Sequence, residues 1–286
     1  MKCIIRFLTP WVSFVALSQF SVMVHGQIVH VAHCMADCPS GAPPNNEVVV
    51  HQLYAASVNS DSGLADWVAY RILGESVGVA SLLPRQWKQD QLLPDNAGNE
   101  PGDSQGPRLT QEAVITQSDR SYRINEYIFD PDDRGRLAPM TSFASTPYWE
   151  ELNNMTNMAP IPSQLRTGSW ARLEQAVNEL AGTDGELYVI SGPLYEISEP
   201  FSLSTSGFDG QPSAYFKVVA TLEQHAAFIF SSELGLNARY CAQQTTLQRI
   251  EQLSGLKLFP SLRQANNRDL ALHYGVQKIK RSCNYK

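Results

Sequence analysis

One amphipathic segment among several strand-like runs constrains the fold more than any other feature of the sequence. Between residues 166 and 180, apolar side chains recur at helical spacing on a single face: Trp170, Leu173, Val177 and Leu180. A helix is therefore expected over 166–180, and Gly182 is expected to close it.

Short apolar or alternating runs, typical of strands, occur at 47–54, 66–73, 186–190, 215–220 and 226–230. Further helices are expected over 148–155 and 246–253. Strands and helices do not alternate regularly, which favours an α+β fold over a doubly wound sheet. Residues 91–119 are rich in turn-forming residues and predict a long surface excursion inside one domain, because apolar segments resume directly after them.

The first 26 residues have the pattern of a secretory signal peptide. Lys2 and Arg6 precede an apolar stretch that runs to Val24 and ends at Gly26. We expect cleavage there, a mature domain over 27–286, and a secreted or periplasmic protein. An uncleaved membrane anchor is the alternative. The apolar stretch is interrupted, however, and no later segment reaches the ~18 apolar residues of a spanning helix, so no membrane attachment is expected after cleavage.

Net charge limits how the mature chain can bind a polyanion. Removal of Lys2 and Arg6 lowers the 22 basic residues to 20 against 28 acidic ones, which gives a net charge of −8. Binding of DNA or RNA by overall charge is therefore excluded, and only a local basic cleft could hold it.

Four cysteines remain in the mature chain: Cys34, Cys38, Cys241 and Cys283. An even number in an exported protein predicts two disulfides, and four cysteines allow three pairings. The most local solution joins Cys34 to Cys38 and Cys241 to Cys283. The alternative is a metal site made by Cys34 and Cys38 with His30 and His33, although that order fits no common zinc spacing.

A polar loop at residues 130–136 (DPDDRGR) concentrates charge. Arginine donors beside acidic side chains could grip a phosphodiester and a hydrated cation, and a merely solvated loop is the alternative. The other groups with catalytic potential are scattered histidines, for which structural or surface roles are expected: His30, His33, His51, His225 and His273.

Residues 133–139 (DRGRLAP) resemble the Asp-Arg-Gly-His-x-Ala-Pro signature of the DNA/RNA non-specific endonuclease family. Residues 157–160 (NMAP) and 165–174 (LRTGSWARLE) resemble its next two motifs. Further matching blocks follow the same order along the chain, at 34–41, 66–71, 85–90, 189–193, 216–219 and 253–256. Agreement of many blocks in one order is far more specific than a single three-residue match.

This resemblance implies a single-domain ββα-metal fold in which an antiparallel sheet carries packed helices. In active members, the signature histidine is the general base and an asparagine at the helix start is the Mg²⁺ ligand. The helix glutamate, here Glu174, holds a metal-bound water, and an upstream arginine, here Arg85, stabilises charge on phosphorus. DNA or RNA is the implied substrate, and the resemblance also allows a homodimer.

This chain departs from that pattern at its most important positions. Arg136 stands in the position of the general base and Arg166 in that of the metal ligand. Ile161 replaces a glutamine, and Asn178 replaces an arginine one helical turn after Glu174. The catalytic motif retains Arg85, Asn157 and Glu174, and Arg134 is also kept.

Arginine cannot take over either role. A guanidinium stays protonated and offers no lone pair to a proton or a cation, so Mg²⁺ is not expected to bind Arg166 and could reach Glu174 only through water. We therefore expect hydrolysis to be lost or strongly reduced. The residues expected to hold nucleic acid are Arg134, Arg136, Arg166 and Asn178.

Two alternatives remain open. The first is an active Mg²⁺-dependent endonuclease with a relocated base, such as Asp132, Asp133 or His225. The second is a non-enzymatic interaction or regulatory module, for which a large exposed apolar patch away from the cleft would be the sign.

Overall fold

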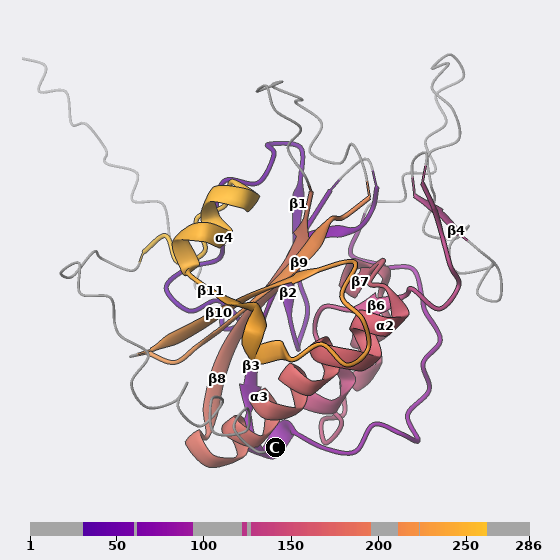
Figure 1. The fold of residues 1–286 in the computed structure, drawn as a ribbon. Coiled ribbons are helices and arrows are strands. Elements are labelled where there is room, and N and C mark those ends of the chain that lie inside the picture. Colours follow the sequence, from indigo (N-terminus) through magenta and orange to yellow (C-terminus); the bar gives the residue numbers. More distant parts are fainter. Residues whose placement is uncertain are drawn as a thin grey trace, which may run out of the picture.

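The structure is a computed structural model that describes residues 31–59, 62–93, 122–124, 127–195, 211–222 and 224–261. Its centre is a seven-stranded sheet with helices on both faces (Figure 1). Helix α3 (Ala171–Asp184) covers one face and α4 (Leu247–Ser254) the other. The predicted α+β class is confirmed.

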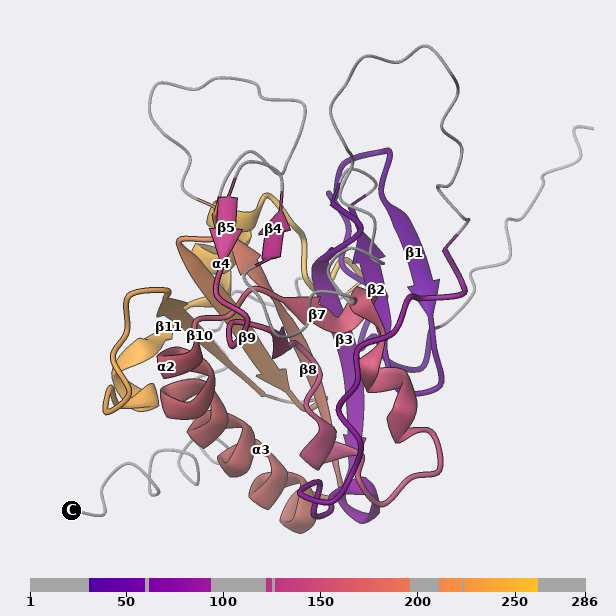
Figure 2. The same ribbon diagram turned by 90° about the vertical axis from the view of Figure 1, so that its right-hand side faces the viewer.

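The sheet has the order β1-β2-β3-β8-β9-β10-β11, and every pairing in it is antiparallel. The strands are β1 (Glu47–Val50), β2 (Ala55–Val58), β3 (Ala65–Leu73), β8 (Glu186–Leu194), β9 (Ala214–Ala220), β10 (His225–Ser231) and β11 (Gln244–Thr245). Figure 2 shows β1 to β3 on one side of the view and β9 to β11 on the other. A separate hairpin joins β4 (Tyr122–Ile124) to β5 (Tyr127–Phe129).

Side-chain alternation along the strands builds two cores. In β3, Val68 and Tyr70 join the core beneath α3, whereas Trp67 and Ala69 join the core beneath α4. This is the period-two alternation expected of a strand, here buried on both faces because helices cover both sides.

A smaller ββα unit packs beside the sheet. Strand β6 (Gly135–Arg136) pairs with β7 (Met158–Ala159), and the chain then enters α2 (Ser163–Leu165), the π-type turn η5 (Arg166–Trp170) and α3. Between the two strands lie the 3₁₀ helices η2 (Met140–Ser142), η3 (Trp149–Asn153) and η4 (Met155–Asn157). Gly135 permits close packing, since a Cβ atom there would lie 2.7 Å from the Ile161 side chain.

The amphipathic helix is confirmed, and its four predicted apolar residues are buried. The prediction that Gly182 closes it was wrong. The helix continues to Asp184 and ends at Gly185, whose φ of +87° suits a residue without Cβ. A 3₁₀ helix, η3, occupies most of the predicted helix at 148–155, and α4 begins after Thr246, whose hydroxyl accepts from Arg249 N.

The prediction of one strand over 47–54 was also wrong. The chain reverses after Val50 through a turn closed by the hydrogen bond from His51 N to Tyr54 O (2.8 Å), so β1 and β2 form a hairpin. No glycine or proline marks this turn, so the sequence of residues 47–54 has the pattern of one continuous strand.

The two ends of the described region meet. Ser40 and Lys257 exchange backbone hydrogen bonds of 3.0 and 2.8 Å. Just before Ser40, Cys34 and Cys38 form the predicted disulfide, which contradicts the alternative of a metal site at these thiols. Cys241 is disulfide-bonded as well.

Several predictions fall on residues outside the described ranges. These are the signal peptide at 1–26, His30, His273, Cys283 and most of the surface excursion at 91–119. Within the described part of the chain, no helix combines the length and apolarity needed to span a membrane.

Candidate functional site

Arg136 lies on β6 and is held from three sides. Its Nε donates to Leu152 O (3.1 Å) and its Nη2 donates to Asn153 Oδ1, while the guanidinium carbon lies 4.3 Å from the centre of the Trp87 ring. Such a cation–π contact also fixes the plane of the guanidinium. Burial, together with nearby Arg85 and Arg166, lowers the pKa of Arg136 to about 10. The group therefore stays positively charged at neutral pH.

Arg85 and Trp87 come from one extended segment, residues 84–92. Asn153 Nδ2 donates to Pro84 O (3.1 Å), Lys88 N donates to Asn153 O (2.9 Å), and Met155 N donates to Lys88 O (3.0 Å). This ladder fastens the segment along η3 and η4. The Arg85 side chain is exposed, and its backbone oxygen lies 3.5 Å from Arg136 Nη2.

Arg166 opens η5, beside the signature loop. Its Nη2 donates to Asp132 O (2.9 Å), but its buried Nε has no hydrogen-bond partner. An unmatched buried donor is costly within a protein unless a ligand supplies the acceptor. The backbone departs from helical geometry two residues later, at Gly168, where a Cβ atom would lie 2.7 Å from Leu236 O. The start of the helix is thereby shaped to present Arg166 at the loop.

Glu174, one turn into α3, is paired with a buried lysine. Lys217 Nζ donates to Glu174 Oε1 (3.0 Å) and to Tyr70 Oη (3.1 Å), and it lies 4.1 Å from the centre of the Trp170 ring. Burial raises the pKa of Glu174, and Lys217 opposes that shift. Burial alone would lower the pKa of Lys217, but Tyr70 and Glu174 raise it above its ordinary value. Lys217 is therefore a buried cation that is paired with Glu174.

Asn157 organises the signature loop from inside. It is fully buried, its Oδ1 accepts from Ala138 N (2.8 Å), and its Nδ2 donates to Ala138 O (2.9 Å) and Leu152 O (3.0 Å). Its amide thus joins the backbone that follows Arg136 to the backbone that holds the Arg136 side chain. Arg134 is also largely buried and donates to Pro131 O (2.7 Å), inside its own loop.

The structure brings Arg85, Arg136, Arg166 and Glu174 into one electrostatic neighbourhood, since the three other groups all shift the pKa of Arg136. We call the three arginines the arginine site. Asn178 points elsewhere: its Oδ1 accepts from Ser142 Oγ (2.6 Å) and its Nδ2 donates to Thr141 Oγ1 (3.1 Å). These bonds fasten α3 to η2 and leave Asn178 mostly buried.

The alternative bases occupy different places. In the sheet, Lys217 of β9 pairs with Phe228 of β10. His225 lies three residues before Phe228 on β10, which puts it roughly 10 Å from Lys217 along the strand direction. Asp133 lies near Arg166, and its Oδ1 accepts from Ser163 N (2.8 Å). Burial raises the pKa of Asp133, while that hydrogen bond and Arg166 oppose the shift.

The residues present do not fit a magnesium ion. Arg166 supplies a cation where the resemblance implies a ligand, and the one carboxylate of α3 that faces the site is paired with Lys217. Among the described residues, no group of three or more His, Cys, Asp or Glu side chains could hold a metal. Hard cations prefer oxygen ligands with free negative charge, and this site offers guanidiniums.

Sequence reasoning gave no role to Lys217, Trp87 or Asn153. A signal for Lys217 was available: it stands inside the apolar run YFKVVA, and a lysine in a buried strand requires a partner of opposite charge. Trp87 and Asn153 offered no such signal, because their contacts with Arg136 arise only when three separate segments meet.

Comparison with known proteins agrees with this architecture. An Asp-Arg-Gly loop on a ββα unit beside an antiparallel sheet defines a ββα-metal nuclease-like fold. A crystal structure of the EndoG/EndoGI complex matches it with a TM-score of 0.57 at 19% identity, covering 77% of this chain and 88% of the other, and so supports the fold alone.

The sequence model of the DNA/RNA non-specific endonuclease family matches residues 38–265. A nuclease of Serratia marcescens is 31% identical over an alignment of 239 residues, and the match covers 81% of this chain and 82% of that protein. A nuclease of Nostoc sp. is 26% identical over 197 residues, 67% of this chain and 62% of that one. The chain belongs to the DNA/RNA non-specific endonuclease family.

Proposed function

We propose that this chain binds nucleic-acid phosphates at the arginine site and has lost most or all metal-dependent hydrolysis. The observation that carries the proposal is the surplus of cations: Arg85 and Arg166 lie close enough to Arg136 to lower its pKa, and Arg166 Nε lacks an acceptor. Guanidiniums match phosphate oxygens with charge-assisted, often bidentate hydrogen bonds. A phosphodiester would supply both the missing charge and the missing acceptor.

Loss of hydrolysis follows from the chemistry of the two substituted positions. A general base typically contributes ~10²–10⁴ in rate. A metal ion adds several kcal/mol of transition-state stabilisation. Arg136 can provide neither a base nor a metal ligand, and Lys217 neutralises Glu174. We also propose that residues 1–26 direct export; a chain beginning at Gln27 in the purified exported protein, measured by mass spectrometry, tests this.

Fluorescence anisotropy with labelled single- and double-stranded oligonucleotides tests binding. Replacing Arg85, Arg136 or Arg166 by Gln should each weaken binding about 10- to 150-fold, the range for one charge-assisted contact. Arg249→Gln is the matched control, because Arg249 is exposed on α4, across the sheet. Equal losses in all four variants would show that overall charge, not the arginine site, holds the oligonucleotide.

A plasmid-cleavage assay tests the loss of hydrolysis. We expect the wild-type chain to leave plasmid intact in Mg²⁺, and activity to return only when Arg136→His and Arg166→Asn are combined. Cleavage by the wild type in Mg²⁺ that stops on adding a chelator would overturn the proposal.

That outcome would support the second candidate function, hydrolysis with Asp133 as the relocated base. The raised pKa of Asp133 and its place beside Arg166 favour this candidate over Asp132 or His225. An interaction module has less support. Among the exposed large apolar side chains, only Val48 and Val50 share a secondary-structure element of the described region, so no broad patch is defined.

A further inference from the structure

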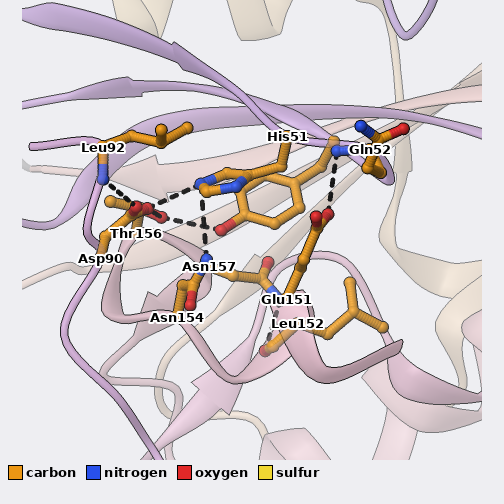
Figure 3. A network of polar contacts seen from close by, with 10 residues as sticks. His51, Gln52, Asp90, Leu92, Glu151, Leu152, Asn154, Thr156 and Asn157 are labelled. Carbon is orange, nitrogen blue, oxygen red and sulfur yellow. Dashed lines mark hydrogen bonds and ion pairs between the residues drawn. The ribbon is translucent and has the colours of Figure 1, made fainter. Parts of the chain in front are cut away.

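A second polar cluster includes a residue of η4, the 3₁₀ helix that directly follows the one holding Arg136. It consists of His51, Tyr54, Asp90 and Thr156, and we call it the Asp90 network (Figure 3). His51 Nε2 lies 2.7 Å from Asp90 Oδ2, Thr156 Oγ1 donates to the same oxygen, and Leu92 N donates to Asp90 Oδ1 (3.0 Å). The side chains of His51 and Asp90 are 7% and 0% exposed.

The hydrogen bonds of this network have fixed directions. Burial alone would raise the pKa of Asp90, but the bonds from His51 and Thr156 hold it below its ordinary value, so Asp90 is ionised and only accepts. The Thr156 hydroxyl therefore donates its hydrogen bond to Asp90. Tyr54, 2.8 Å from Thr156 Oγ1, must donate to that oxygen, and burial raises the pKa of Tyr54, which keeps its hydroxyl protonated.

His51 belongs to a rigid turn. Its backbone N–H donates to Tyr54 O (2.8 Å), and its backbone oxygen accepts from His33 Nε2 (2.9 Å). The imidazole is buried and its Nε2 is engaged by Asp90, so His51 cannot touch a ligand directly. His51 therefore acts on the site through its neighbours, which are Asp90 and Asn154, whose Nδ2 lies 3.4 Å from His51 Nε2.

Asp90 lies in the segment that carries part of the arginine site. Lys88, two residues earlier, pairs with the backbone of Asn153 and Met155. The same segment, 84–92, contributes Arg85 and Trp87, whereas Asn153 binds Arg136. The Asp90 network therefore anchors one end of this segment to η4 and to the β1–β2 turn.

We infer that His51 is a positioning residue of the arginine site. By holding Asp90, it fixes segment 84–92 against η4 and so sets where Arg85 and Trp87 lie relative to Arg136. This inference rests on the proposed function for its ligand readout, but its structural readout needs no ligand.

The test uses the whole chain without ligand, in ¹H–¹⁵N spectra that resolve the Trp87 indole N–H and the Arg136 Nε–H. His51→Ala should shift both signals and weaken oligonucleotide binding about three- to tenfold, the range for losing one well-placed hydrogen bond. His51→Gln, which retains a side-chain N–H donor, should restore most of both. Tyr54→Phe removes only the hydrogen bond from Tyr54 to Thr156 and leaves the bonds to Asp90 in place, so it should shift the same signals less.

Ile250→Val provides the control for general destabilisation. Ile250 is fully buried in the core on the α4 face, so this change lowers stability without touching the Asp90 network. It should leave the Trp87 and Arg136 signals in place. Unmoved signals in His51→Ala would overturn the positioning role, even if oligonucleotide binding is weakened. Absence of binding in the wild type, with the shifts present, would instead overturn the proposed function.

Discussion

The arginine site and the Asp90 network share one stretch of backbone, η3 to η4, yet their polar groups are balanced differently. In the network, a single ionised carboxylate receives hydrogen bonds from His51, Thr156 and Leu92. In the arginine site, the guanidiniums of Arg136 and Arg166 donate only to carbonyl and amide oxygens, and among the described residues none of the three arginines forms an ion pair. Matched groups of this kind stabilise a fold, whereas a surplus of one charge serves a ligand.

The buried pair Lys217–Glu174 belongs to the matched class, and removing one member gives the largest expected effect. Lys217→Met would leave the largely buried Glu174 without the cation that is hydrogen-bonded to it. Breaking a buried ion pair this way costs about 3–5 kcal/mol in free energy of unfolding. Urea denaturation measures it.

Lys257→Met is the matched control for that measurement. Lys257 is well exposed and pairs with Glu251 at the surface, so this loss should stay below about 1 kcal/mol. Similar losses for the two lysines would show that burial does not separate the two kinds of pair.

The pH dependence of stability gives an intermediate effect. Burial lowers the pKa of His33, whose Nε2 binds the turn that carries His51. As the pH falls, His33 is protonated in the unfolded chain at a higher pH than in the folded chain. The contribution of His33 to the free energy of unfolding is therefore fully present above about pH 6.5 and decreases as the pH falls below that value. We expect this contribution to decrease as the pH falls from 7 to 5.

The contribution of His33 is obtained as the difference between wild type and His33→Gln in urea midpoints across that range. A difference is needed because Asp66 works in the opposite direction. Burial raises the pKa of Asp66 to about 6, so its cost to stability grows as pH rises towards that value. A flat difference curve for His33 would contradict the prediction.

The smallest expected change in stability comes from the arginine site itself. Arg136→Gln should alter the free energy of unfolding by no more than about 1 kcal/mol, because the loss of its bonds to Leu152 and Asn153 is offset by relief of repulsion from Arg85 and Arg166. Thermal or urea unfolding checks this beside the binding assay. A loss above about 2 kcal/mol would place Arg136 among the structural, matched groups.

Local patterns predicted the parts of the fold that depend on local chemistry. The apolar face of α3 and the alternation of β3 follow from spacing alone, and both are buried as expected. The turn at 51–54 escaped prediction because its residues carry no turn signature. Helix α3 ends at Gly185 and not at Gly182. The sequence offers a glycine at both positions, and only the start of β8 at Glu186 decides between them.

The site was predictable only in part, for a physical reason. Arg136, Arg166 and Glu174 could be placed together from their order in matching motifs, and the pKa of Arg136 responds to both of the others. The contact of Arg136 with Trp87 joins residues 49 positions apart through a segment without regular secondary structure, which no periodicity reports. Asn178 lies on the helix at the predicted position, but its side-chain amide forms hydrogen bonds with η2 and not with the arginine site.

The bond between Ser40 and Lys257 has a consequence for how the chain comes to be made. These residues are separated by more than two hundred positions, so the contact carries a high loop-closure cost and forms late in folding. During synthesis, α4 and the strand residues that it covers cannot meet until α4 has left the ribosome. The nascent chain therefore keeps one face of its sheet open until α4 has been made.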